Sequence, residues 1–175
     1  RERLGDLGGK RVAVSWAYSP SYAKPLSVPQ GLITLLTRFG AHVTLAQPEG
    51  YRLMEEPMAA AAANATAAGG SFRVVASMDE AFAGAQAVYP KSWGPWALMQ
   101  ERVEANQKGD KARMADIEKR ALKRNAKFKS WICDEKRMAR TAGGDALYLH
   151  CLPADIGAEV SPKVMDAHRL NVACE

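Results

Sequence analysis

The sequence lacks any long hydrophobic run. No stretch of about 18 apolar residues occurs, although 47% of its 175 residues are hydrophobic. Residues 1–6 also lack the apolar centre that a secretory signal needs. We therefore expect residues 1–175 to form a single cytoplasmic domain with no membrane partner.

Cysteine is scarce and its spacing forms no motif. Cys133, Cys151 and Cys174 are far apart, odd in number, and include no Cys-x-x-Cys pair. This pattern excludes a disulfide framework and the usual zinc and redox motifs. We expect free thiols in a reducing compartment, and no metal site.

Glycine is missing where a dinucleotide site would need it. The loop after the first predicted strand has no glycine before Gly31, whereas binding of pyrophosphate needs Gly-x-Gly-x-x-Gly there. NAD and FAD are therefore not expected as cofactors. Pro20, Pro25 and Pro29 stiffen this loop instead, and a rigid surface turn is the alternative to a ligand loop.

The positive charge is concentrated in one segment. Residues 108–129 contain nine Lys and Arg against three acids, a local charge of +6, which leaves about −1 for the rest of a chain of net charge +5. Met114, Ile117, Ala121 and Phe128 form an apolar stripe at helical spacing through the segment. Because no recognised nucleic-acid-binding motif is present, we expect a solvated surface helix and no nucleic-acid partner.

Strand-like and helix-like segments alternate along the chain. This order predicts an α/β fold, with a doubly wound, mostly parallel, Rossmann-like sheet. The last apolar run lies at the end of the chain, which favours truncation of a longer protein. The predicted strands are 10–16, 41–46, 72–76, 87–89, 146–150 and 170–173, and the predicted helices cover 30–39, 55–68, 77–85, the polar region around 108–129, 134–141 and a short segment from 161.

Ligands of such sheets bind beyond the carboxyl ends of the strands. After the fourth predicted strand, a loop that runs to Trp96 holds Lys91, Ser92 and Trp93 between Pro90 and Gly94. A cation, a hydroxyl and an indole together suit an anionic small molecule, although exposed Trp and Lys also occur in interface loops.

The fifth predicted strand leads directly into His150 and Cys151. Adjacent residues of an extended strand point to opposite sides, so a Cys–His catalytic pair is not expected. A turn in which His150 polarises a carbonyl group is the functional interpretation. The alternative is a buried histidine that satisfies its hydrogen bonds before a turn.

Several motifs resemble one enzyme family. Residues 150–153 match the His-Cys-Leu-Pro motif of the ornithine branch of the transcarbamylases. The stretches 18–22, 24–31, 49–51, 89–93 and 150–156 are similar to the knotted transcarbamylases, which include acetylornithine and succinylornithine enzymes, and most of all to a knotted relative of unassigned substrate. The resemblance covers the amino-acid-binding domain from beginning to end.

The resemblance implies carbamoyl transfer from carbamoyl phosphate to an amine, without a metal or redox cofactor. The His150 ring would hold the carbonyl oxygen, and the Cys151 and Leu152 carbonyl groups would accept hydrogen bonds from the carbamoyl NH₂. Lys91 would bind the carboxylate of the amine substrate, and Asp155 would bind its polar end. The residues assigned on this basis are His150, Cys151, Leu152 and Pro153 for catalysis, and Ser27, Lys91, Ser92, Trp93 and Asp155 for substrate binding.

Two phosphate-binding motifs of the family, Ser-x-Arg-Thr-Arg and His-Pro-x-Gln, are missing. We therefore expect an absent N-terminal domain to bind carbamoyl phosphate, a homotrimeric full-length enzyme, and an isolated chain without turnover. The resemblance further implies a cis Leu152–Pro153 bond and a trefoil knot through the loop at 18–30. A non-catalytic amino-acid-binding or regulatory module of the same fold is the alternative.

Overall fold

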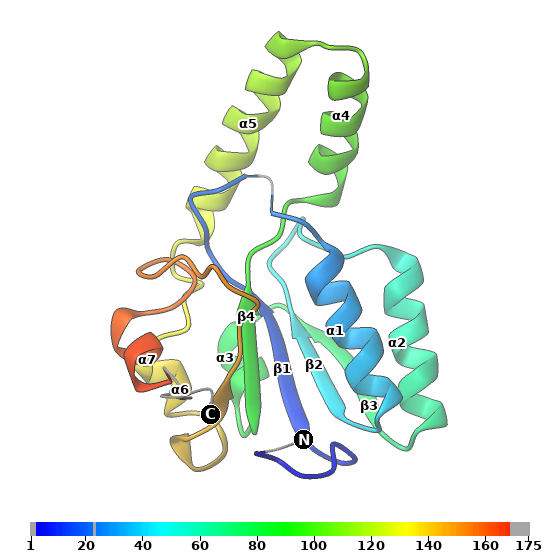
Figure 1. The fold of residues 1–175 in the computed structure, drawn as a ribbon, viewed down its shortest axis with the longest axis vertical. Helices are drawn as coiled ribbons and strands as arrows, with labels where there is room; N and C mark the ends of the chain where they lie inside the picture. The colour runs from blue at the N-terminus through cyan, green and yellow to red at the C-terminus, as the bar shows by residue number, and fades with distance from the viewer. Residues whose placement is uncertain (1–2, 23, 169–175) are drawn as a thin grey trace, which may run out of the picture.

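Five parallel strands form the centre of the protein (Figure 1). The computed structural model describes residues 3–22 and 24–168. The strands lie in the order β3-β2-β1-β4-β5, and every neighbouring pair is parallel. The strands are β1 (Arg11–Trp16), β2 (His42–Ala46), β3 (Ser71–Val75), β4 (Ala87–Lys91) and β5 (Leu147–Tyr148), and the helices are α1 (Ser27–Arg38), α2 (Glu55–Ala67), α3 (Met78–Phe82), α4 (Trp96–Gln107), α5 (Lys111–Asn125), η1 (Ala126–Phe128), α6 (Glu135–Met138), η2 (Ala142–Gly144) and α7 (Pro162–Ala167).

Helices cover both faces of the sheet, because successive residues of each strand point to opposite sides. Val12, Val14 and Trp16 of β1 pack in one hydrophobic cluster with residues of α1 and α2. Ala13 belongs to a second cluster with residues of α3, α6 and α7. This arrangement confirms the predicted doubly wound α/β fold. No helix of the described residues is long and apolar enough to span a bilayer.

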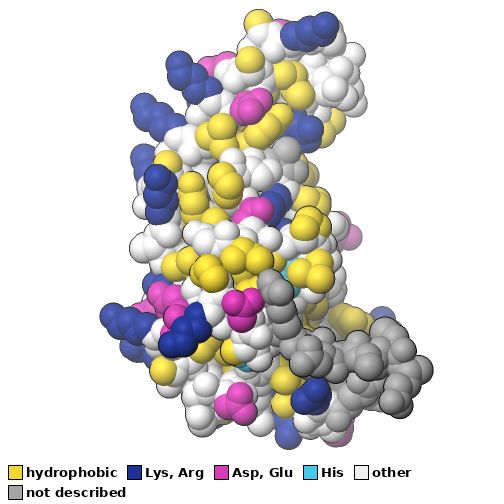
Figure 2. All heavy atoms as spheres, turned by 60° about the vertical axis from the view of Figure 1, so that its left-hand side comes forward, with side chains coloured by type: hydrophobic (Ala, Val, Ile, Leu, Met, Phe, Trp, Pro, Cys, Tyr) yellow, Lys and Arg dark blue, Asp and Glu magenta, His cyan; other side chains and the backbone are white. Residues whose placement is uncertain are grey.

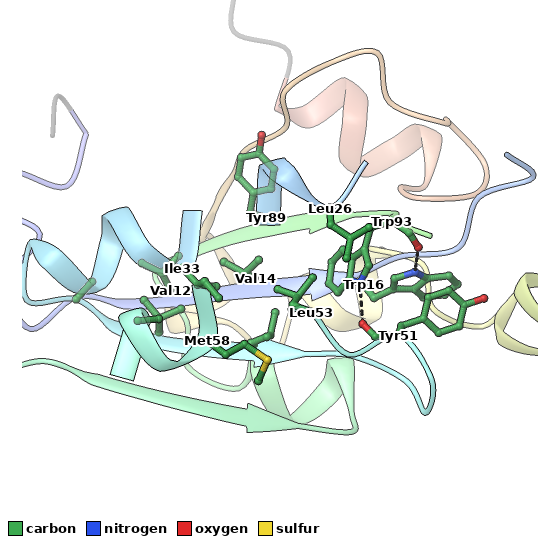
Figure 3. Packing of buried hydrophobic residues seen from close by; sticks show 14 of the residues in the cluster. Val12, Val14, Trp16, Leu26, Ile33, Tyr51, Leu53, Met58, Tyr89 and Trp93 are labelled. Carbon is green, nitrogen blue, oxygen red and sulfur yellow. Dashed lines mark hydrogen bonds between the residues drawn. The ribbon is translucent and has the colours of Figure 1, made fainter. Parts of the chain in front are cut away.

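Large aromatic side chains close the core at the carboxyl ends of the strands (Figure 3). The Trp16 indole N–H donates to the Trp93 carbonyl at 3.0 Å, and the Trp93 indole N–H donates to the Tyr51 carbonyl at 2.8 Å. The Trp16 ring also packs edge-on against Phe128 and Trp131. Buried indoles usually find an acceptor, and here the acceptors are backbone groups of two other loops, so the loops after β2 and β4 are fixed to the end of β1.

Helices α4 and α5 form a hairpin that projects beyond the sheet (Figure 1). Leu98 and Ala105 of α4 pack against Ile117 and Ala121 of α5, which confirms the buried face expected for the basic segment. Lys and Arg side chains gather along this part of the surface (Figure 2). The hairpin turns at Gly109, whose φ of +64° suits glycine.

The first helix and the loop after β4 differ from their predicted limits. Helix α1 begins at Ser27 rather than at residue 30, since Pro29 lies in its first turn, where the missing N–H costs no hydrogen bond. Trp96 was expected in the loop after β4, but it is the first residue of α4.

Strand β5 is shorter than expected, and Pro90 accounts for its end. The backbone N–H groups of Leu147 and Leu149 donate to the carbonyl groups of Gln86 and Val88, both at 3.0 Å. The next residue of β4 on this side is Pro90, which has no N–H to offer β5. The chain therefore leaves the sheet before His150.

Three helices begin at residues whose side chains cap them. Ser77, Asp134 and Ser161 each accept a hydrogen bond from a backbone N–H in the first turn. The capping box at Ser77 is only half formed, because the Glu80 carboxylate binds Arg73 at 2.7 Å instead.

The predicted strand 170–173 and the third cysteine lie outside the described residues, and the trefoil knot stays a prediction.

Asn125 offers a test of this architecture. Its buried side chain accepts from the Tyr51 hydroxyl and donates to the Ser19 and Ser21 carbonyl groups at 3.1 and 3.0 Å. Replacing it by alanine leaves buried polar groups unpaired, so Asn125→Ala should lower the free energy of unfolding by about 3 kcal/mol in urea titrations. The exposed Asn106→Ala is the matched control, and equal stability of the two variants would contradict this role.

Candidate functional site

The candidate site lies where the strand order reverses. Chain connections run from β1 outwards to β2 and β3 on one side, and to β4 and β5 on the other. The carboxyl ends of β1 and β4 therefore form a topological switch point, the usual place for ligands in open α/β sheets. The loops after β1, β4 and β5 meet there, as the sequence predicted.

A buried carboxylate, that of Glu159, joins these loops. Its side chain is 0% exposed. Oε1 accepts from the Ser92 backbone N–H at 2.6 Å and from Lys91 Nζ at 3.3 Å. Oε2 accepts from the Asp155 backbone N–H at 2.9 Å and from Lys24 Nζ at 3.0 Å. One side chain thus contacts residues that follow three different strands.

His150 lies beside this carboxylate. Its side chain is 1% exposed, and its ring stacks with the rings of Tyr89 and Tyr148. Nδ1 accepts from the Leu152 backbone N–H at 2.9 Å, which places the ring proton of the neutral imidazole on Nε2. Nε2 is 3.4 Å from Glu159 Oε2, close enough for electrostatic attraction but without an aligned hydrogen bond within the described residues.

The turn after His150 is exposed. Cys151, Leu152 and Pro153 all lie on the surface, and the Leu152–Pro153 bond is cis, as predicted. No hydrogen bond of the described residues reaches the carbonyl oxygens of Cys151 or Leu152. Neither ring nitrogen of His150 hydrogen-bonds the Cys151 thiol within that part of the chain, in agreement with the expectation that the pair is no catalytic dyad.

The end of β4 and the loop after it lie deeper than their composition suggested, and Lys91, predicted in the loop, is the last residue of β4. The Lys91 side chain is 7% exposed, while Ser92 and Trp93 are each 1% exposed. A Cβ at Gly94 would lie 2.7 Å from Met99 Sδ and 3.3 Å from the Tyr22 carbonyl oxygen. A side chain here would therefore displace the Met99 side chain and crowd the loop after β1.

Asp155 is hydrogen-bonded within the cluster around Glu159, whereas Ser27 lies outside that cluster. Asp155 Oδ2 accepts from Ser19 Oγ at 2.5 Å and from Lys24 Nζ at 2.6 Å, and no hydrogen bond of the described residues reaches Oδ1. Ser27 is exposed at the first position of α1, and no hydrogen bond within the described ranges ties its hydroxyl to Glu159 or its partners.

The charges of the cluster stabilise one another. Burial alone would raise the pKa of Glu159, but contacts with His150, with two backbone N–H groups and with Lys24 outweigh burial and lower the pKa well below its usual range. Burial opposes the charge of Lys24, yet hydrogen bonds to Asp155 and Glu159 raise its pKa. Burial raises the pKa of the Tyr89 and Tyr148 hydroxyls, so both rings beside His150 are neutral at physiological pH.

Sequence reasoning missed Glu159. The one signal was an acid between the apolar residues Ala158 and Val160, since an acid in such a position needs partners if it is buried. Lys24 was included only as the first residue of the family-like stretch 24–31, without a role of its own. Among residues 3–22 and 24–168, no group of three or more His, Cys, Asp and Glu side chains could hold a metal ion.

The low pKa of Glu159 predicts a pH-dependent stability. A carboxylate whose pKa is lower in the folded state stabilises the fold above the unfolded pKa of about 4.3, and this contribution is lost as the pH falls below that value. In urea titrations between about pH 6 and pH 3.5, Glu159→Gln should therefore lose less stability than the wild type. The exposed Glu104→Gln should follow the wild type, and parallel curves for all three proteins would contradict the prediction.

Comparisons with known proteins identify the family to which the chain belongs. The family model "Aspartate/ornithine carbamoyltransferase, Asp/Orn binding domain" matches residues 26–175. YgeW of Escherichia coli (strain K12), a carbamoyltransferase by name, is 51% identical over 179 residues, which cover 97% of this chain and 45% of YgeW. The N-acetylornithine carbamoyltransferase of Xanthomonas campestris pv. campestris is 35% identical over 165 residues, which cover 93% of this chain and 42% of that protein.

Solved structures of transcarbamylases also resemble this chain in fold and in sequence. A crystal structure of N-acetyl-L-ornithine transcarbamylase has a TM-score of 0.75 and 32% identity, covering 94% of this chain and 45% of that one. A complex of acetylornithine transcarbamylase with acetylcitrulline gives the same values. The chain thus spans about half the length of the relatives it matches. It belongs to the aspartate/ornithine carbamoyltransferase family and corresponds to the Asp/Orn binding domain.

Proposed function

We propose that the protein containing this chain transfers a carbamoyl group from carbamoyl phosphate to the amino group of an amino acid or a related amine. The chain would supply the second-substrate half of the site. One observation carries this proposal beyond family membership: among the described residues, no aligned hydrogen bond reaches Nε2 of His150 or the carbonyl oxygens of Cys151 and Leu152, and all three groups belong to one turn. One donor and two acceptors are what the C=O and NH₂ of a carbamoyl group require.

These groups would act on the transition state of the transfer. The uncharged amine attacks the carbamoyl carbon to form an N–C bond, and negative charge collects on the carbonyl oxygen. The C–O bond to phosphate then breaks, and the departing phosphate takes the proton that the attacking nitrogen loses. A donor aimed at that oxygen stabilises the charge where it develops. The Cys151 and Leu152 carbonyls would orient the carbamoyl group by accepting from its NH₂, with Pro153 holding the turn.

The loop after β4 would hold the carboxylate end of the second substrate. Lys91 at the end of β4, and Ser92 and Trp93 of the loop after it, are fixed by Glu159 and by the core. Lys91 Nζ has further protons for a ligand carboxylate, because an ammonium group carries three donors. Asp155 Oδ1 would accept from a polar or cationic end of the ligand, and the exposed hydroxyl of Ser27 would add a contact at the start of α1.

Other parts of the site would come from outside the chain. We propose that an N-terminal domain binds the phosphate of carbamoyl phosphate and that the full-length protein is a homotrimer. Leu149, Leu152 and Ile156 are 45%, 65% and 50% exposed, and Figure 2 shows hydrophobic side chains gathered at mid-height on this side of the molecule. Such a surface suits a neighbouring domain.

The cytoplasm is the proposed compartment, where the free Cys133 and Cys151 would stay reduced.

Activity of the full-length protein tests the proposal. Phosphate release from carbamoyl phosphate should be measured with a panel of amines that includes ornithine, N-acetylornithine and aspartate. We expect release with at least one amine that carries a carboxylate, and neither release nor a stable trimer in sedimentation for residues 1–175 alone. Binding of an amino acid without turnover by any amine would instead support the non-catalytic binding module.

Replacement of His150 tests the role of its ring. In the full-length protein, His150→Gln should lower kcat by about 10²-fold, the usual loss when one donor to a developing oxyanion is removed. His42→Gln is the matched control, because His42 lies at the first position of β2, at the opposite end of the sheet from the site. An unchanged kcat in a folded His150→Gln variant would contradict the assignment.

A further inference from the structure

We propose that Glu159 is a positioning residue of the carbamoyl-transfer site. Its carboxylate would hold His150 in the Nε2-protonated tautomer and keep the loops after β1, β4 and β5 in one arrangement. This inference rests on the proposed function. It adds a residue to which the sequence motifs assign no role.

The contacts of Glu159 lie at the ends of separate elements. Ser92 directly follows β4, Lys24 lies in the loop after β1, and Asp155 lies in the turn after β5. Charge-assisted hydrogen bonds of this kind are stronger than neutral ones. Because these bonds share one buried carboxylate, movement of one loop would break bonds that also hold the other two.

The carboxylate and the turn favour the same tautomer of His150. The Leu152 N–H donates to Nδ1 at 2.9 Å, and Glu159 Oε2 lies 3.4 Å from Nε2. A negative charge beside Nε2 favours the proton on that nitrogen. The backbone N–H of Asp155, bound to the same Oε2, further fixes the turn that contains Leu152. The ring would then present its proton as the proposed carbonyl donor.

A purely structural role for Glu159 is the competing explanation. Removing its charge leaves Lys91 buried without its anion, which by itself destabilises a protein strongly. The two explanations separate in a Lys91→Met background, where that cation is also removed. There Glu159→Gln should cost less stability than in the wild-type background, because only Lys24 and the two backbone N–H groups lose their anion, yet a positioning residue should still be needed for turnover.

The first experiment measures kinetics and stability of the full-length protein, with carbamoyl phosphate and the best amine of the panel. Glu159→Gln should lower kcat by about tenfold or more in both the wild-type and the Lys91→Met backgrounds, with smaller changes in KM. Glu159→Asp, which keeps the charge, should retain a higher kcat than Glu159→Gln. If the loss of kcat disappears in the Lys91→Met background together with the loss of stability, the role is structural and the proposal is wrong.

The second experiment does not depend on turnover. Long-range ¹H–¹⁵N spectra of protein labelled with [¹⁵N]histidine distinguish the tautomers of His150, whose signals are assigned by their loss in His150→Gln. We expect the Nε2-protonated form in the wild type and in Glu159→Asp, and a mixture of tautomers in Glu159→Gln. Identical His150 shifts in all three proteins would overturn the proposal. If no amine turns over, the proposed function fails, and these spectra still decide the role of Glu159.

Discussion

Glu159 carries its charge in a place without access to water, so the chain has to balance that charge itself. Two lysine ammonium groups, two backbone N–H groups and a histidine ring do so. Isolated buried carboxylates are unstable, and they persist only where their partners are held in place. The loops that provide these partners are therefore ordered by the same contacts that keep the carboxylate ionised.

The remaining architecture makes room for this cluster. Pro90 ends the pairing between β4 and β5, which lets the chain turn away from the sheet before His150. Trp16 and Trp93 anchor the neighbouring loops through indole hydrogen bonds to backbone carbonyls. Around the buried charges, an exposed turn at Cys151 and Leu152 offers carbonyl oxygens that no hydrogen bond reaches within the part of the chain that the structure describes. Rigid support beneath an open turn is an arrangement that suits ligand binding.

Much of this could be predicted from the sequence because the signals were local. The alternation of strands and helices and the motif at residues 150–153 each depend on neighbouring residues. The start of α1 and the end of β5 were predicted at the wrong residues. Pro29 fits the first turn of a helix, and Pro90 removes a hydrogen-bond donor from the pairing with β5, but both effects depend on the position of the proline in the folded element. The partners of Glu159 could not be predicted, because Lys24 and Lys91 are 135 and 68 residues away in the chain and only the fold brings them together.

A crystal structure of the full-length protein with bound carbamoyl phosphate would test the account most directly. We expect the carbamoyl oxygen at about 2.7–3.2 Å from His150 Nε2, the carbamoyl NH₂ donating to the Cys151 and Leu152 carbonyls, and Glu159 still bound to Lys91 and Lys24. A ligand held elsewhere, or a His150 ring whose Nε2 remains unpaired in the complex, would contradict it.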